Sequence, residues 1–211
     1  PDDAPARLLA IATAIGPLLV QGYGEDTKPA FAVLDAADPR TLTPAMRARI
    51  LHGAGIRAQL EGRPDRTFKI FRDAAKNARD AGNPLFVLDC MNNEANALLG
   101  LGAWYEADSS LRAVGDIAAR LHVRMVEGIA LVNRGVAASG RGAHGEGRAL
   151  LEQGRAMLKG AYGARADCAC AIYAANMALA DGDVGRADEE SALAVTHAER
   201  APTYRPVALA V

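Results

Sequence analysis

The chain has 211 residues, of which 50% are hydrophobic, and its 24 basic and 25 acidic residues give it a net charge of −1. These values are typical of a soluble, globular protein that buries a sizeable core. No long run of like charge occurs along the chain. We therefore expect neither a nucleic-acid interface nor a membrane-surface patch, and hence no direct nucleic-acid or membrane partner.

The first apolar stretch, residues 8–20, contains Gly16 and Pro17 and is too short to span a bilayer, so the sequence predicts a buried helix there. The three cysteines show no C-x-x-C spacing, which argues against a disulfide framework and against a zinc site. They are Cys90, Cys168 and Cys170. A reducing, cytoplasmic location fits this cysteine usage best.

Glycines recur at intervals of forty residues between apolar periodic segments, at Gly22, Gly62, Gly102, Gly142 and Gly182. The fifth residue after each glycine is small, and the ninth is apolar in four of the five repeats. Small residues allow two helices to approach closely, and large apolar residues fill the gap between them. The period therefore predicts an all-α array of helical hairpins, with helices of about 16 residues.

The expected hairpins span residues 4–40, 44–82, 84–122, 124–162 and 164–201, and residues 202–211 match the start of a sixth first helix. Prolines mark the joins, in Asp38-Pro39, Gly82-Asn83-Pro84 and Ala201-Pro202. Strand signals are nearly absent. We therefore expect one repeat domain over residues 1–211, and we expect the array to continue in a longer protein.

Three residues of the third hairpin have expected roles. Leu111 is predicted to be a buried contact between helices, and Leu121 to continue the same apolar face. Trp104, at the start of the second helix of this hairpin, is predicted to be a packing anchor rather than a binding platform.

The stretch GRGAHGEGR contains Gly140, Gly142 and Gly145 at the G-x-G-x-x-G spacing of a dinucleotide-binding loop. Such a loop follows a strand and opens a helix within a strand-helix-strand unit. A helical pattern precedes the glycines here, and Gly142 is one of the glycines of the forty-residue period. The sequence therefore predicts a turn between two helices rather than a phosphate-binding loop.

The repeats approximate one order, in which a small residue is followed by a glycine seven positions later, a small residue five positions after the glycine, an apolar residue and then another small residue. This order resembles the tetratricopeptide repeat. The matching residues are Gly55, Gly62, Phe71 and Ala74 in the second hairpin, Ala95, Gly102, Ala107 and Leu111 in the third, and Ala175, Gly182, Ala187 and Ala194 in the fifth. The period is forty rather than about 34 residues. The family's aromatic residues in the first helix are replaced by Leu18, Ala58, Leu98, Ala138 and Ala178.

The resemblance implies a right-handed superhelical solenoid of about five antiparallel hairpins, whose first helices line a concave wall. Longer repeats of this kind are similar to those in large bacterial transcription factors and in the tails of bacterial Ser/Thr kinases. The implied function is a non-catalytic scaffold that binds a protein or peptide segment in its concave groove, as a regulatory module of a larger bacterial protein. The alternative is a domain of a transcriptional regulator or kinase that senses a small ligand or effector.

In this register, polar side chains of the first helices line the concave wall. Asn93 is in phase with Asn133, and Asn96 with Asn176. An asparagine amide both donates to and accepts from a peptide backbone, so these residues are candidates for binding a partner, with solvated or inter-helix polar roles as the alternative. The full candidate set is Arg49, His52, Gln59, Asp89, Asn92, Asn93, Asn96, Asn133, Tyr173 and Asn176.

No catalytic, metal or cofactor site is expected. The four histidines, His52, His122, His144 and His197, fall in different hairpins and show no paired-ligand spacing. No serine lies in a G-x-S-x-G motif. The sequence therefore predicts a protein that is not an enzyme, and it leaves the oligomeric state open.

Overall fold

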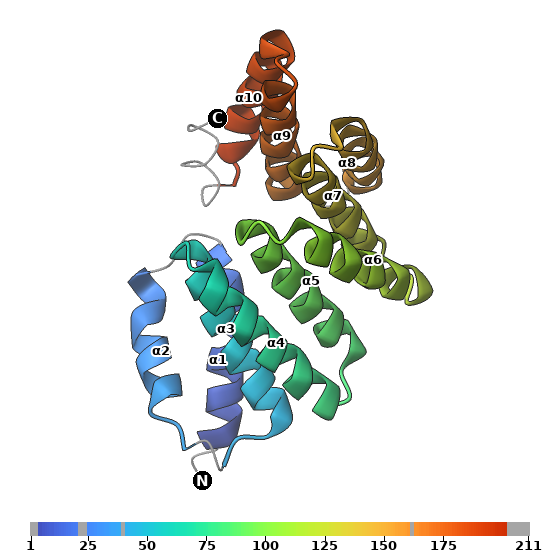
Figure 1. Cartoon of the computed structure of the whole chain (residues 1–211). Helices are drawn as coiled ribbons and strands as arrows, with labels where there is room; N and C mark the ends of the chain where they lie inside the picture. Colours follow the sequence, from blue (N-terminus) through green and yellow to red (C-terminus); the bar gives the residue numbers. More distant parts are fainter. Residues whose placement is uncertain (1–3, 21–24, 39–40, 161–162, 202–211) are drawn as a thin grey trace. The chain divides into compact units, whose positions relative to one another are not determined.

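The computed structural model describes residues 4–20, 25–38, 41–160 and 163–201, and no strand occurs in these ranges. They contain ten α-helices (Figure 1) and the short 3₁₀ helix Glu25–Thr27. The prediction of an all-α protein is therefore confirmed. The chain divides into two compact units, Pro1–Ala97 and Leu98–Val211, and each is described by itself. The expectation of one domain over the whole chain stays a prediction.

The helices occur in pairs along the chain. Unit 1 contains α1 (Ala4–Val20), η1 (Glu25–Thr27), α2 (Lys28–Asp35), α3 (Pro44–Leu60), α4 (Pro64–Asp80) and most of α5 (Pro84–Gly100). Unit 2 contains the end of α5, α6 (Trp104–Arg120), α7 (Arg124–Gly140), α8 (His144–Leu158), α9 (Gly163–Ala180) and α10 (Val184–Ala198). Each predicted hairpin range thus holds two helices, and α3 to α7 are each 17 residues long.

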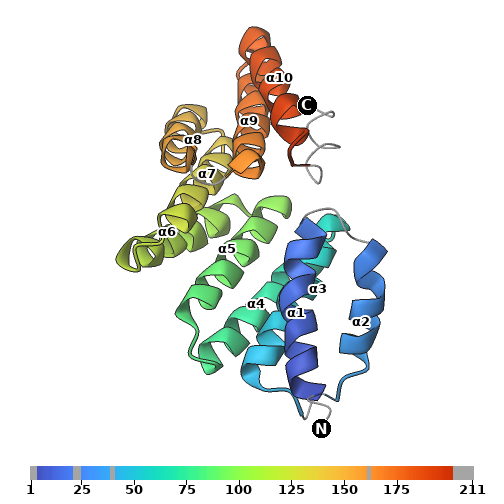
Figure 2. The same cartoon turned by 180° about the vertical axis from the view of Figure 1, so that it is seen from behind.

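In unit 1, α3 and α4 form an antiparallel hairpin, α1 packs on α3, and α2 packs on α1 (Figures 1 and 2). The core between them contains Ile15, Phe31 and Phe71, all nearly inaccessible to solvent. The small residue predicted at position 55 has a direct role, because a Cβ on Gly55 would lie 2.8 Å from the Phe71 ring. The absence of that side chain lets Phe71 of α4 fill the space beside α3.

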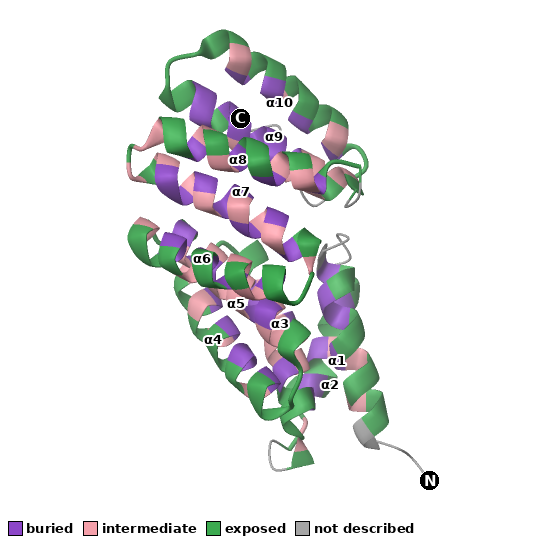
Figure 3. Ribbon diagram, turned by 90° about the vertical axis from the view of Figure 1, so that its right-hand side faces the viewer, coloured by how far each residue is buried: buried purple, intermediate pink, exposed green. Residues whose placement is uncertain are grey.

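In unit 2, α7 packs on α6 and α8, and α9 packs on α8 and α10. Buried residues recur along the length of α7, whereas α10 keeps a broad exposed face (Figure 3). Leu111 of α6 is fully buried, as predicted, and Trp104 packs against the end of α7, where a Cβ on Gly140 would lie 2.5 Å from its indole ring. Leu121 is exposed, contrary to expectation, because it follows the last residue of α6 and begins the turn.

One turn type ends six of the helices. After α3, the Gly62 N–H donates to the Gln59 carbonyl and the Arg63 N–H donates to the Ala58 carbonyl, at 3.1 and 3.0 Å. This pair of bonds is a Schellman motif, which places its central residue in the left-handed region; φ at Gly62 is 67°. The same bonds recur after α4, α5, α6, α7 and α9, at Gly82, Gly102, His122, Gly142 and Gly182.

The predicted turn positions of Gly62, Gly102, Gly142 and Gly182 are therefore confirmed, and Gly22 lies outside the described residues. The turn also occurs halfway between them, at Gly82 and His122, so the structural repeat from α3 to α7 is one helix and one turn of twenty residues. Turns within hairpins and turns between hairpins are thus alike. The predicted sixth helix, residues 202–211, also lies outside the described residues.

Candidate functional site

A group of polar side chains lies between α3 and α5 in unit 1. Arg49 and His52 are one turn apart on α3, and Asp89 and Asn93 are one turn apart on α5. His52 Nε2 lies 2.8 Å from Asp89 Oδ2. Asn93 Nδ2 donates to the Asp89 backbone carbonyl at 2.9 Å and to Asp89 Oδ1 at 3.3 Å. We call these four residues the α3–α5 polar cluster; all four belong to the set predicted from the sequence.

Aromatic rings hold the basic members of the α3–α5 polar cluster in place. The Arg49 guanidinium lies 4.5 Å from the centre of the Phe86 ring, and the His52 ring lies 5.1 Å from the same ring and edge-on to Phe71 at 5.6 Å. Gly16 of α1 makes room for the imidazole, since a Cβ there would lie 3.2 Å from His52 Nδ1. The His52 side chain is 17% exposed and the Asp89 side chain 47% exposed, so the carboxylate is the accessible end of the pair.

The paired His52 and Asp89 side chains resemble the base and orienting carboxylate of a nucleophilic site, which also needs an activated nucleophile. The neighbouring thiol, Cys90, is buried. Burial, with a contribution from the Asp89 charge, raises the pKa of Cys90 to about 12. Cys90 is therefore protonated at neutral pH and does not supply a nucleophile to this pair.

Three further candidates lie in unit 1. Gln59 is exposed near the end of α3, and Asn96 is half-buried on α5. Asn92, also half-buried on α5, has a buried Oδ1 that accepts no hydrogen bond from any described residue. An unpaired buried carbonyl is costly, so Asn92 is the one candidate with an unmet hydrogen-bonding requirement.

The remaining candidates lie in unit 2 and do not form one group there. Asn133 of α7 is only 3% exposed, so its side chain is part of the packed interior. Tyr173 of α9 is half-buried and packs against two apolar clusters, and Asn176 on the same helix is exposed. Asn133 and Asn93 thus occupy the same position of the repeat but differ in exposure, because Asn133 is buried and Asn93 is half-buried.

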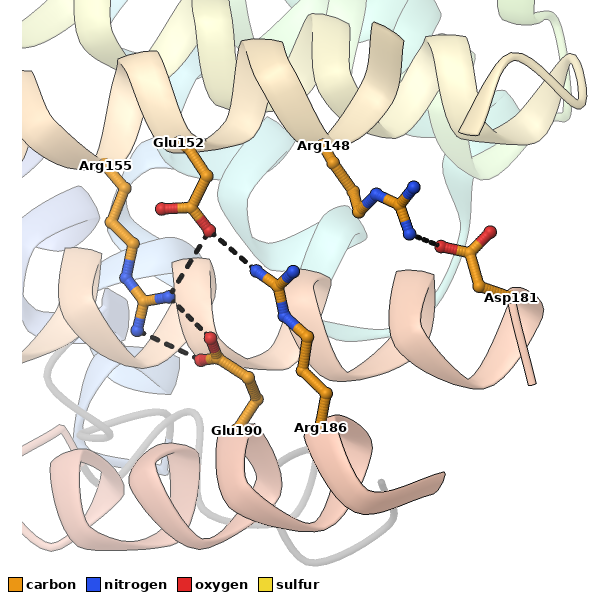
Figure 4. Close-up of polar contacts among 6 residues, drawn as sticks. All are labelled: Arg148, Glu152, Arg155, Asp181, Arg186 and Glu190. Carbon is orange, nitrogen blue, oxygen red and sulfur yellow. Dashed lines mark hydrogen bonds and ion pairs between the residues drawn. The ribbon is translucent and has the colours of Figure 1, made fainter. Parts of the chain in front are cut away.

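Charged clusters in unit 2 were missed by the sequence analysis. The largest joins α8 to α10 and to the turn after α9 (Figure 4). Arg155 donates two hydrogen bonds to Glu190, at 2.8 and 3.0 Å, and Arg186 Nη2 donates to Glu152 Oε1 at 3.0 Å. The bonds to Glu190 raise the pKa of the Arg155 guanidinium above its ordinary value, against the opposing effect of burial. With the pair Arg148–Asp181, these residues form what we call the α8–α10 ladder.

A second cluster joins α6 to α7 around one buried carboxylate. Asp108 accepts hydrogen bonds from Arg134 Nε and from Arg112 Nη2, both at 3.0 Å, and Arg141 Nη1 lies 3.4 Å from Asp108 Oδ2. Burial by itself would raise the pKa of the Asp108 carboxyl, but the bonds from Arg134 and Arg112 outweigh it, and the pKa is lowered. Glu146 of α8 lies 3.5 Å from Arg141 Nη2. These five residues are the α6–α7 arginine cluster.

The glycines of the GRGAHGEGR stretch have packing and turn roles. Gly140 contacts the Trp104 ring, Gly142 is the left-handed residue of the α7–α8 turn, and Gly147 allows close approach to the α7 backbone. A Cβ on Gly145 would meet no atom within 4 Å. Helix α7 precedes the stretch, as predicted, so the strand that a dinucleotide-binding loop requires is absent at this point.

Within the described parts of the chain, no helix combines the length and apolar character needed to cross a membrane. In the same parts, no group of three or more His, Cys, Asp or Glu side chains lies close enough to hold a metal ion. No protein-family model matches the sequence, and no curated protein is significantly similar to it.

Proposed function

We propose that this chain is a non-catalytic scaffold whose hairpins stack in a right-handed superhelix and whose first helices bind an extended protein segment. The observation that supports the proposal is the α3–α5 polar cluster. It places a half-exposed carboxylate, a guanidinium over an aromatic ring and an asparagine amide on the first helices of two successive hairpins. Such side chains recognise the polar groups of a peptide backbone and charged side chains next to it.

The test uses the purified chain and a displayed library of random dodecapeptides. A selected sequence is synthesised with a fluorescent label, and its Kd is measured by anisotropy for the wild-type protein and for Asn93→Ala. Because a neutral hydrogen bond contributes about 0.5–1.5 kcal/mol, the variant should bind roughly 2- to 12-fold more weakly.

Asn77→Ala is a matched control. Asn77 Nδ2 donates to the Asp73 backbone carbonyl at 2.9 Å, which is the same local bond that Asn93 makes to Asp89, but Asn77 lies on α4, a second helix. Both variants should therefore change the free energy of unfolding by similar amounts, and only Asn93→Ala should weaken the peptide. Equal affinities of the two variants, or failure of the library to yield a selected sequence, would refute the proposal.

Sensing of a small ligand is a second proposal, and it is supported by the unpaired Oδ1 of Asn92. A ligand with an N–H or O–H donor would satisfy this atom and stabilise the folded protein. We expect such a ligand to raise the Tm of the wild-type protein in a metabolite screen and to have a smaller effect on Asn92→Leu. A hit that raises both Tm values equally does not act through Asn92 and counts against this proposal.

A further inference from the structure

The α6–α7 arginine cluster is unbalanced in charge. Its three guanidinium groups, from Arg112, Arg134 and Arg141, face two carboxylates, Asp108 and Glu146. Among the described residues, no other carboxylate lies within 4.0 Å of these guanidinium groups. The cluster therefore carries one positive charge more than its acidic members neutralise.

The α8–α10 ladder provides an internal comparison. It contains three arginines and three carboxylates, so each guanidinium has its own acidic partner (Figure 4). In the α6–α7 arginine cluster, by contrast, the single Asp108 carboxylate is shared by three guanidinium groups. The same unit thus contains one balanced and one unbalanced arrangement of arginine side chains.

Two of the three guanidinium groups are largely removed from water, and the third is exposed. The side chains of Arg134 and Arg141 are 17% and 12% exposed, and that of Asp108 is 12% exposed. A charge in such surroundings is costly unless an opposite charge lies close to it. Arg112, which is 57% exposed, marks the side from which an anion can reach the cluster.

The donors needed to bind an anion are present. Each guanidinium has five N–H donors, and Asp108 receives only one hydrogen bond from Arg134 and one from Arg112. Tyr105, one turn before Asp108 on α6, has its ring 5.4 Å from the Arg141 guanidinium and is 74% exposed. Tyrosine and arginine are among the residues enriched at the energetically important positions of protein interfaces.

We propose that the α6–α7 arginine cluster binds an oxyanion on a peptide, either a side-chain carboxylate or a phosphate group, through Arg112 and Arg134. Arg134 supplies a fixed guanidinium because Asp108 orients it, and Arg112 closes on the anion from solvent. Two guanidinium groups that converge on one oxyanion form charge-assisted hydrogen bonds, which are about twice as strong as neutral ones. This site lies on different residues from the α3–α5 polar cluster and does not depend on the function proposed above.

The experiment titrates the whole chain with four probes at constant ionic strength, set with sodium chloride. The probes are inorganic phosphate, a phosphoserine peptide, the same peptide with glutamate in place of phosphoserine, and the same peptide with serine. Binding is followed by the Nε–H resonances of the arginines in ¹H–¹⁵N NMR spectra. We expect at least one of the two charged peptides to bind and shift the Arg134 resonance, and the serine peptide to leave it unchanged. Binding of the phosphoserine peptide without the glutamate peptide identifies a phosphate site, and binding of the glutamate peptide, with or without the other, identifies a site for which a carboxylate is sufficient.

Variants assign the binding to the cluster. Arg134→Gln should weaken the bound probe about 10-fold or more, as expected for loss of a charged hydrogen bond. Arg112→Gln should also weaken binding. If Arg134→Gln does not fold, Arg112→Gln alone tests the site, because this variant keeps the more buried pair of Arg134 and Asp108. Arg186→Gln, in the balanced ladder, should bind as the wild type does. Absence of binding by both charged peptides, even if inorganic phosphate binds, or equal weakening by Arg112→Gln and Arg186→Gln, overturns the proposal.

Discussion

The glycines between α7 and α8 place two helix backbones in direct contact. A Cβ on Gly135 would lie 2.7 Å from the carbonyl oxygen of Gly147, and one on Gly154 would lie 2.6 Å from the carbonyl oxygen of Gly128. A backbone atom cannot move aside as a flexible side chain can, so these positions exclude any larger residue without a shift of the helices. Gly135, Gly147 and Gly154 stand at the small-residue positions of the tetratricopeptide-like order, whereas Gly128 stands at no repeated position and was not recognised.

Two alanine substitutions in the GRGAHGEGR stretch should have opposite effects. Gly147→Ala places a methyl group 2.8 Å from the Gly135 carbonyl oxygen, and we expect it to lower the free energy of unfolding by about 1–3 kcal/mol. Gly145→Ala, two residues earlier in the same helix, adds a methyl group in open space and should raise it by about 0.5–1 kcal/mol, because alanine favours helix. Urea denaturation of both variants measures the difference. Equal effects of the two would show that α7 and α8 do not approach as closely as the structure indicates.

Burial keeps the cysteine thiols of α9 in their protonated form. Burial raises the pKa of Cys170 to about 11 and raises that of Cys168, which lies two residues earlier on α9 and donates to the Ala194 carbonyl at 3.4 Å. Thiols of this kind are protonated at neutral pH. All three cysteines of the chain are free and buried.

At the scale of the helices and turns, local sequence signals account for most boundaries. Pro44, Pro64 and Pro84 begin α3, α4 and α5, where a missing N–H costs nothing. Asn83 and Asp183 each accept a hydrogen bond from the backbone N–H three residues later and so cap α5 and α10. These signals are local, and for that reason they could be predicted.

The twenty-residue repeat was missed because its turn residue is not always glycine. His122 occupies the position of Gly102 and Gly142 with φ of 56°, and it forms the same hydrogen bonds at the end of α6. A search for glycines alone therefore finds the turns within hairpins and overlooks their equivalence with the turns between hairpins. The signal in the sequence was Gly82, which lies midway between Gly62 and Gly102.

An exchange of turn residues tests this equivalence. A residue with a Cβ pays about 1–2 kcal/mol for a left-handed conformation, so His122→Gly should stabilise the protein by roughly 0.5–1 kcal/mol after the entropy of the unfolded glycine is subtracted. Gly142→Ala should destabilise it by about 1 kcal/mol, although a Cβ there meets no atom within 4 Å. Both are measured by urea denaturation. If His122→Gly proves destabilising, the imidazole contributes a contact that outweighs the backbone strain.

Pairing of charges between helices could not be predicted from the sequence. Arg155 and Glu190 are 35 residues apart, and Arg134 and Asp108 are 26 apart. Whether such residues meet depends on the rotation of each helix about its axis, which is set by the apolar side chains beneath them. The charge order Arg148, Glu152 and Arg155 along one face of α8 was the available signal, and it would have indicated a partner helix without identifying it.

At the scale of the whole molecule, burial of apolar faces requires neighbouring hairpins. Tyr173 packs against both apolar clusters of unit 2, one formed with α7 and α8 and the other with α10. A single hairpin cannot cover such a face, which is the physical reason why a regular period in the sequence predicts an array. The sense and size of the rotation between hairpins depend on side-chain volumes at each interface rather than on the period. The right-handed superhelix therefore stays a prediction.

The stability of the protein in acid depends on carboxyl groups whose pKa differs between the folded and unfolded states, and Asp108 is such a group. Its pKa in the folded state is lowered from the ordinary 3.8. A lowered pKa contributes stability that is fully present above pH 3.8 and is lost as the pH falls through the folded-state pKa. We therefore expect Asp108→Asn to lower the free energy of unfolding at pH 7 by about 1–3 kcal/mol, because the bonds from Arg134 and Arg112 lose their charged acceptor.

The difference between Asp108→Asn and the wild type should shrink as the pH is lowered from 4 toward 2, since protonation removes the same charge from the wild-type protein. Asp65→Asn is the control, because Asp65 is 61% exposed and lies 3.9 Å from Arg63. As an exposed ion pair contributes little, Asp65→Asn should change the free energy of unfolding at pH 7 by less than about 1 kcal/mol. Unfolding in urea at a series of pH values, followed by circular dichroism, measures both differences. A constant gap between Asp108→Asn and the wild type down to pH 2 would mean that the Asp108 charge does not stabilise the α6–α7 contact and that the asparagine acts by changing the packing alone.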